Sequence, residues 1–188
     1  MAKPRSEEKR RGVLDAATRI IAAQGLSATT TAIAKEAEVS NGTLFVYFAT
    51  KSELLNQLYI ALKEEIGAVS TDGLPTDETA YDQARHMWTR QVQWATTHPD
   101  KRQALVLLSV SDAITPESHR SAQGAFTEIR RVLEQSRDQG NLSGVSLEFV
   151  AALMTSVADT TITFMRDDPA NAETYCQEGF EAFWRMVA

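Results

Sequence analysis

Three small residues, Asn41, Gly42 and Thr43, follow Ser40 where the sequence predicts the start of a short helix. A side-chain amide matches the major-groove edge of adenine, and a hydroxyl can bond to several base edges. The major groove is roughly 12 Å wide, so a helix that enters it needs small side chains in its first turn. These residues therefore suit the reading of base edges in double-stranded DNA.

Residues that could support catalysis or bind a metal do not cluster in the sequence. The three histidines, His86, His98 and His119, fall on separate predicted helices or their ends, and none forms a Glu-x-x-His pair. The single cysteine, Cys176, excludes an intramolecular disulfide. We expect no catalytic residue, no metal site and no cofactor, and hence a protein that is not an enzyme.

Charge is distributed unevenly along the chain. The 188 residues carry a formal charge of -6, which by itself disfavours contact with phosphates. Residues 1–51, however, hold eight basic and five acidic side chains, so their charge is +3 and residues 52–188 carry the remaining -9. The basic segment, which includes Lys3, Arg5, Arg10 and Arg11, would attract a DNA backbone.

No apolar run predicts a membrane segment or a secretory leader. The first eleven residues are almost entirely polar, and the apolar runs at 104–108 and 149–154 are far shorter than the roughly 20 residues that span a bilayer. We therefore expect a soluble, cytoplasmic protein with no membrane partner.

Apolar residues recur at helical spacing along almost the whole chain, and no useful length shows the alternation of a strand. The sequence predicts an all-α fold of about nine helices. We expect an N-terminal helix-turn-helix domain over residues 1–51 and a helical ligand-binding and dimerisation domain over residues 52–188. The expected helices cover about 7–24, 29–37, 40–48, 50–68, 77–97, 99–111, 115–139, 146–166 and 168–188.

The helices at 29–37 and 40–48, joined through residues 38–40, form a predicted helix-turn-helix. The run from Thr29 to Phe48, continued by residues 49–55, resembles the DNA-binding signature of the TetR-family transcriptional repressors. A second similarity, in residues 44–51, Tyr59, His98-Pro99 and residues 180–184, is to the multidrug-responsive RamR-type members of that family.

The resemblance implies DNA contacts at eight positions: Thr30, Thr31, Asn41, Gly42, Thr43, Phe45, Tyr47 and Lys51. Two of them depart from the family pattern. Asn41 stands where lysine is frequent, which would exchange a charge contact for amide readout of adenine. Phe45 stands where tyrosine is frequent, so it would contact a thymine methyl group rather than a phosphate. Considered alone, Tyr47 could instead be an aromatic at the core edge, and Lys51 a solvated lysine.

The resemblance also assigns residues 52–188 a dimer interface and a small-molecule pocket. Two apolar stripes on the last two helices predict a homodimer through them, unless both stripes pack within one chain. They comprise Leu147, Val150, Ala151, Met154, Val157, Ala158, Thr161, Ile162 and Met165, and then Cys176, Phe180, Phe183, Trp184 and Val187.

Residues Trp88, Gln91 and Trp94 share one side of the helix at 77–97, because they are three residues apart. With Tyr59, Phe126 and Met154 they are the candidate ligand-binding residues, since aromatic and methionine side chains suit hydrophobic or cationic aromatic molecules. We expect a repressor that binds a palindromic operator as a dimer and is released by such an effector. The alternative is a helical ligand carrier or interaction protein without specific DNA binding.

Overall fold

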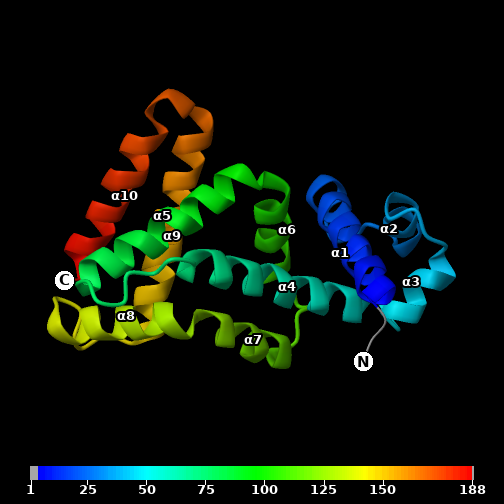
Figure 1. Ribbon diagram of the computed structural model, residues 1–188, viewed down its shortest axis with the longest axis horizontal. Coiled ribbons are helices and arrows are strands. Elements are labelled where there is room, and N and C mark those ends of the chain that lie inside the picture. The colour runs from blue at the N-terminus through cyan, green and yellow to red at the C-terminus, as the bar shows by residue number, and fades with distance from the viewer. Residues whose placement is uncertain (1–3, 188) are drawn as a thin grey trace. The chain divides into compact units, whose positions relative to one another are not determined.

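The computed structural model describes residues 4–187, and within that range the chain is entirely helical, as the sequence predicts (Figure 1). It forms ten α-helices and two short 3-10 helices there. Their bounds are α1 Pro4–Gln24, α2 Thr30–Glu36, α3 Asn41–Tyr47, α4 Lys51–Thr71, α5 Ala80–Thr97, α6 Pro99–Ser109, α7 Pro116–Gln123, η1 Gly124–Phe126, α8 Thr127–Gln139, α9 Leu147–Asp167, η2 Pro169–Asn171 and α10 Ala172–Val187. Lys3, which was expected to add positive charge, lies outside the described residues.

The single helix expected over residues 115–139 is wrong, because the chain there forms α7, η1 and α8. Glycine is a poor residue for a helix interior, and Gly124 begins the 3-10 turn. The turn passes very close to α4: a Cβ on Gly67 would lie 2.9 Å from the Cβ of Ala125 and would collide with its carbonyl oxygen. Helix α4 and η1 can therefore approach this closely only because residue 67 is a glycine.

Several helices begin at hydroxyl caps. The side chains of Thr29, Ser40 and Ser146 each accept a hydrogen bond from the amide three residues later. At the start of α4, Thr50 accepts from the amide of Glu53, whose carboxylate accepts from the amide of Ala49. These short-range bonds satisfy amides that the first turn of a helix leaves without a partner.

The chain divides into two compact units. The first unit comprises Met1–Glu64 and His98–Gln123, and the second comprises Glu65–Thr97 and Gly124–Ala188. The first unit thus combines α1, α2, α3 and most of α4 with α6 and α7. These units are defined by packing, so the functional boundary between residues 51 and 52 stays a prediction.

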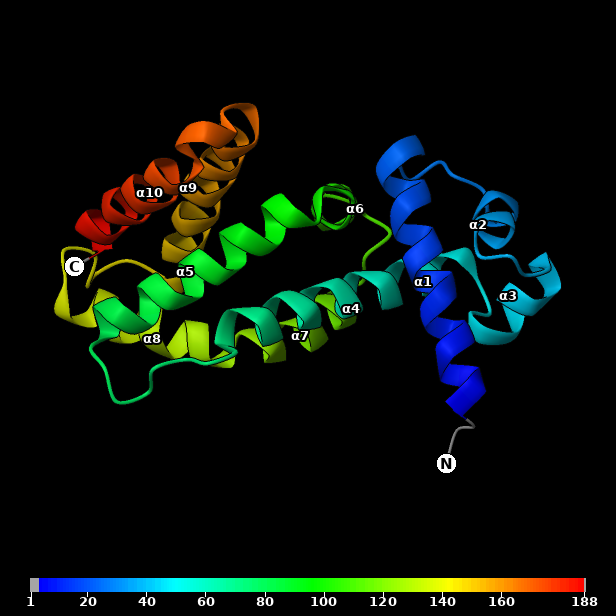
Figure 2. The same ribbon diagram turned by 45° about the horizontal axis from the view of Figure 1, so that its top comes forward.

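The core of the first unit is built around the two short helices α2 and α3. Helix α1 packs against α2 and α6, and α2 packs against α3 (Figure 2). Ile33 of α2 and Leu44 of α3 are fully buried, in one cluster with apolar side chains of α1, α4 and α6. A short helix gains most of its stability from such packing, because it has few internal hydrogen bonds.

In the second unit, α9 and α10 form an antiparallel hairpin joined by η2, and α9 also packs against α5 and α8. The two helices come close at Gly179, where a Cβ would lie 3.2 Å from that of Thr161 and collide with its hydroxyl. Trp88 of α5 stacks on Phe183 of α10, with ring centroids 6.2 Å apart. Its indole N–H donates to the carbonyl oxygen of Cys176 at 3.0 Å.

The apolar stripes expected to form a dimer interface are largely buried within the protomer. Val150, Ala158 and Ile162 of α9, and Phe180 and Phe183 of α10, are all buried. The expectation that these side chains face a second copy is therefore wrong for most of them. The surface that the hairpin leaves exposed lies on the opposite side of both helices, and it carries Phe149, Ser156, Thr160, Phe164, Glu178 and Ala182.

Helix α9 is the one helix among residues 4–187 that is long and apolar enough to cross a membrane, judged by length and composition alone. Uninterrupted apolar runs in the sequence do not indicate this property of α9, because threonines and serines divide the helix into shorter runs. Their hydroxyls bond within the helix: Thr155, Thr161 and Thr163, for example, each donate to the carbonyl four residues earlier. In this structure 28% of its most apolar window is buried.

Candidate nucleic-acid interface and ligand cavity

The turn between α2 and α3 is held by two backbone hydrogen bonds. The amide of Glu38 donates to the carbonyl of Lys35 at 3.1 Å, and the amide of Val39 donates to that of Ala34 at 3.0 Å. This is a Schellman motif, which requires a left-handed residue and usually has glycine there. Here Glu38 takes that conformation, with φ of 54°. It is the only non-glycine residue with positive φ among residues 4–187.

The side chains of residues 41–48 fall into four rows, because residues four apart lie on one side of a helix. Leu44 and Phe48 are 0% exposed and fix the inner side. Opposite them lies the row of Gly42 and Val46, both exposed. The two flanks carry Asn41 with Phe45, and Thr43 with Tyr47, and the second pair is half-buried.

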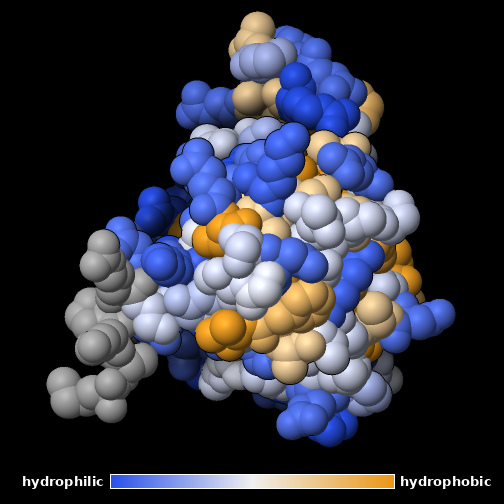
Figure 3. Space-filling view, turned by 90° about the vertical axis from the view of Figure 1, so that its right-hand side faces the viewer, coloured by the Kyte–Doolittle hydropathy of each residue, from blue (hydrophilic) through white to orange (hydrophobic). Residues whose placement is uncertain are grey.

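Most of the residues predicted to contact DNA therefore reach the surface of the first unit. Figure 3 looks onto the side of this unit that carries α2 and α3, and it shows hydrophobic residues among hydrophilic ones there. Thr31 is exposed at the start of α2, and Thr30 is half-buried. The Thr43 hydroxyl lies 2.8 Å from that of Ser40, so it is already part of the helix cap.

Three of the basic or aromatic candidates also have contacts within the protein. The Lys51 ammonium donates to the carbonyl oxygen of Leu26 at 2.7 Å, which ties α4 to the loop after α1. Arg10 donates to Gln57 at 2.8 Å, and its guanidinium lies 5.4 Å from the centroid of the Phe48 ring. Tyr47 packs at the edge of the core cluster.

One residue that holds the unit together was missed by the sequence analysis. The buried side chain of Asn56 donates to the carbonyls of Ser52 and Ala113, both at 2.8 Å. Its oxygen accepts from the amide of Thr115 at 2.9 Å. Asn56 thereby joins α4 to the segment between α6 and α7. The available signal was an amide at an apolar position of a helix, next to Leu55 and two residues before Leu58.

Three of the six predicted ligand-binding residues lie together in the second unit. Trp88, Gln91 and Met154 line a cavity of about 20 Å³. The other lining side chains are apolar: Ala84, Met87, Ile129, Val132, Leu133, Phe180 and Phe183. A cavity of this size has room for about one water molecule, so the structure is closed around it.

The other three predicted ligand residues do not line this cavity. Tyr59 lies in the first unit, where its hydroxyl is 3.0 Å from Nδ1 of His119, and burial raises the pKa of this phenol. The indole of Trp94 donates to Glu65 at 2.8 Å. Phe126 ends η1 and is half-buried. Their role in binding stays a prediction.

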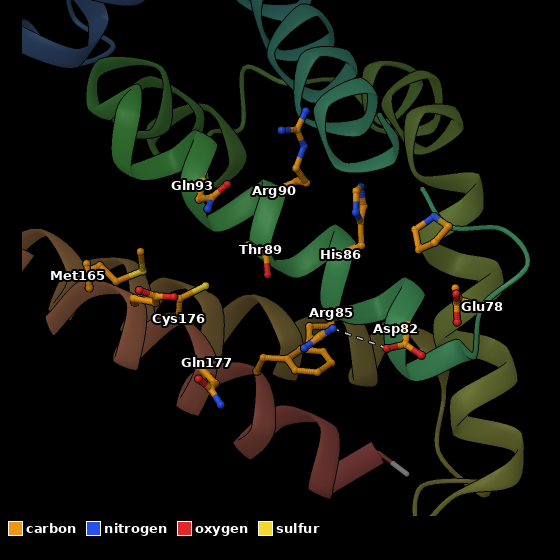
Figure 4. Close-up of a pocket in the computed structure, with 14 residues that line it drawn as sticks. Glu78, Asp82, Arg85, His86, Thr89, Arg90, Gln93, Met165, Cys176 and Gln177 are labelled. Carbon is orange, nitrogen blue, oxygen red and sulfur yellow. Dashed lines mark ion pairs between the residues drawn. The ribbon is translucent and has the colours of Figure 1, made fainter. Parts of the chain in front are cut away.

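A larger groove lies between α5 and α10 in the second unit (Figure 4). Its volume is about 910 Å³, within the range typical of small-molecule sites. The groove carries charges of both signs, and Arg85 and Asp82 form an ion pair of 3.8 Å across one turn of α5. Phe180 lines both this groove and the small cavity, so its ring stands between them.

Part of the first unit resembles a known protein family. Residues 13–58 match the family of bacterial regulatory proteins called the tetR family. This segment is therefore similar to the N-terminal domain of that family. The matched residues contain α2, the turn and α3, and most of α1 and the start of α4. The family is described as one of bacterial regulatory proteins.

Crystal structures of TetR-family regulators share the fold of the whole chain. A protein from Shewanella sp. PV-4, with 24% identity, covers 96% of this chain and 98% of its own with a TM-score of 0.86. One from Marinobacter aquaeolei VT8, with 18% identity, has the same TM-score over 98% of this chain and 97% of its own. The regulator FadR from Bacillus subtilis, in complex with stearoyl-CoA, has 17% identity and a TM-score of 0.72 over 95% of this chain and 99% of its own.

The left-handed Glu38 gives a testable prediction about the turn between α2 and α3. Replacing Glu38 by glycine should raise the free energy of unfolding by about 1 kcal/mol, because glycine adopts positive φ without a steric penalty. Glu38→Ala removes the same charge but keeps a Cβ, and should give no comparable gain. Urea denaturation of both variants measures the difference. Equal stabilisation by the two substitutions would attribute the effect to charge and contradict this explanation.

Proposed function

We propose that this chain is a ligand-responsive transcriptional repressor that binds a palindromic DNA operator as a homodimer. The observation that carries the proposal is the helix-turn-helix of α2 and α3, buried on one side and lined with small polar and apolar residues on the other. The tetR match over residues 13–58 supports it. A repressor acts where the chromosome is, so we also propose that the protein is soluble and cytoplasmic.

The DNA contacts follow from the exposed rows of α3 and the start of α2. Asn41 and Thr43 would bond to base edges in the major groove. Thr30 and Thr31 would contact a phosphate or a base edge, and Tyr47 a phosphate or a base. Lys51 has two ammonium protons left after its bond to Leu26, and these would face a phosphate.

Gly42 supports this docking because nothing inside the protein requires a glycine there. A Cβ at this position would meet only the Ser40 hydroxyl oxygen at 3.8 Å, an ordinary contact. Its φ is also not in the left-handed region. Glycine allows an external partner to approach the backbone closely, and we propose that the partner is the operator.

Gly42→Ala should therefore separate binding from folding. We expect a free energy of unfolding equal to or above that of the wild type, because alanine is the better helix former. Affinity for the operator should fall about tenfold or more, since a methyl group would stand in the interface. The matched control is Gly124→Ala in η1, where a Cβ meets nothing within 4 Å. Unchanged operator affinity in a mobility-shift titration of Gly42→Ala would contradict the proposed orientation of α3.

We place the dimer interface on the exposed side of the α9–α10 hairpin. A surface hollow of about 450 Å³ lies there, lined by small residues such as Thr160, Gly179 and Ala182 together with Phe164. The ring of Phe164 lies 5.5 Å from that of Tyr175. Small residues allow helices of two copies to approach closely, and a two-fold dimer would hold two α3 helices about one DNA turn apart.

Ala182→Arg should dissociate this dimer without unfolding the protomer, because the residue is exposed. We expect a monomer by sedimentation velocity at micromolar concentration. Affinity for the full palindrome should fall to that for a half-site, since the two contacts are no longer linked. Gln135→Arg, at an exposed position of α8, is the control with the same added side chain. A dimer that survives Ala182→Arg would place the interface elsewhere.

The effector site that we propose combines the small cavity with the adjoining groove. Movement of the Phe180 ring would open the apolar cavity between α5, α8 and α10 to the groove, where Glu78, Asp82 and Glu173 supply negative charge. A hydrophobic or cationic aromatic effector fits this combination, as in a multidrug-responsive repressor of the RamR type. If the effector binds preferentially to a conformation that cannot bind the operator, it would lower the affinity of the protein for the operator. The complex of FadR with stearoyl-CoA makes an acyl-CoA the second class to test.

Ethidium, a planar aromatic cation, and stearoyl-CoA are the two probes. Ethidium should weaken operator binding and quench tryptophan fluorescence, because Trp88 lines the cavity. Glu78→Gln should weaken the response to ethidium severalfold, and Glu117→Gln, at an exposed position of α7, should leave it unchanged. A response to stearoyl-CoA alone would replace the cationic class by the acyl class. If neither probe changes operator affinity, the proposed response fails for both classes.

A further inference from the structure

The centre of the exposed side of α3 is apolar. Val46 is 81% exposed and Phe45 is 41% exposed. Burial of Leu44 and Phe48 sets this orientation, because Val46 lies two residues from each, on the opposite side of the helix. Gly42 precedes Val46 by one turn and has no side chain, so nothing on α3 covers the isopropyl group from that direction.

No residue of α3 is charged, and its polar and apolar residues occupy different turns. Asn41 and Thr43 lie in the first turn, whereas Phe45 and Val46 lie in the second. A surface that contacts only phosphates would gain nothing from Phe45 and Val46, because phosphates are anionic and these side chains are apolar. The helix therefore offers hydrogen bonds at its start and an apolar contact beyond it.

The major groove contains one apolar group that such side chains can contact, the 5-methyl group of thymine. All other groups on the base edges in that groove are hydrogen-bond donors or acceptors or small C–H groups. A β-branched side chain on an exposed helix position also adds no helix stability compared with alanine. The exposed pair is therefore best explained by a partner that buries it.

We infer that Val46, assisted by Phe45, reads thymine methyl groups, so that thymine at the contacted position is a determinant of operator specificity. The inference rests on the proposed function, because it applies to the same surface of α3. It goes further in naming which base the operator must carry and which side chain selects it. Asn41 would select an adenine nearby, since its amide matches the adenine edge.

The first experiment begins with selection of the bound sequence from a library of random DNA duplexes. Each thymine in the selected half-site is then replaced by deoxyuridine, which lacks only the 5-methyl group and keeps the pairing with adenine. We expect one or two thymines at which the replacement weakens binding about fourfold per half-site, the effect of exposing one buried methyl group. The other thymines should change affinity less than twofold.

The second experiment links the methyl group to Val46. Val46→Ala should weaken binding to the thymine operator and lose most of its discrimination between thymine and uracil, because the isopropyl contact is gone. Val46→Thr keeps the shape of the side chain but replaces a methyl group by a hydroxyl, and it should also lose discrimination. Val110→Ala is the matched control, since Val110 is likewise 81% exposed and lies at the end of α6.

The outcomes separate this inference from the proposed function. Tight, sequence-specific binding in which no uracil replacement matters would overturn the reading of methyl groups and leave the repressor intact. Equal discrimination by the wild type and Val46→Ala would assign the methyl contact to another residue and also overturn it. If selection enriches no sequence at all, the DNA-binding function itself fails, and the inference fails with it.

Discussion

The candidate DNA-binding surface depends on the burial of two side chains, Leu44 and Phe48. Helix α3 has seven residues, too few to form a stable helix alone in water. It exists because these two residues are fully buried in a cluster with apolar side chains of α1, α2 and α4. The Ser40 cap and the backbone bonds of the turn define where the helix starts, but packing holds it in place.

Burial of one side of α3 determines which side chains are exposed on its other side. Once Leu44 and Phe48 point inward, the helical repeat places Gly42 and Val46 outward and leaves Asn41 and Thr43 on the flanks. Two side chains of α4 fix the elements around α3 by hydrogen bonds. Lys51 donates to the carbonyl of Leu26, and Asn56 donates to a carbonyl in the segment after α6. The same compact unit therefore contains both the candidate DNA-binding surface and helices α6 and α7.

The same rule of one buried and one exposed side applies to the α9–α10 hairpin, with a different result. Its larger apolar residues fill the core of the second unit, where Phe180 and Phe183 pack against the rings of Trp88 and Tyr81. Tyr81 also donates to Glu181, and this hydrogen bond raises the pKa of its phenol. The exposed side carries small residues such as Thr160 and Ala182 beside the exposed ring of Phe164, and such small residues allow a second helix to approach closely.

The sequence alone was sufficient for features that depend on neighbours a few residues apart. Helical periodicity and the resemblance of the 29–55 segment depend only on such neighbours, and the helical fold and the tetR match agree with them. The basic charge of residues 1–51 could also be counted directly.

Features that depend on residues far apart in the chain required the tertiary structure. Periodicity identifies an apolar stripe on α9 but not whether it faces its own chain or another, because that depends on what α5, α8 and α10 cover. The close approach of Ala125 to Gly67 joins two elements that are far apart in the chain, and the role of Asn56 depends on a carbonyl 57 residues away. Only folding brings such groups together, because the local sequence around a residue does not indicate which distant residue it contacts.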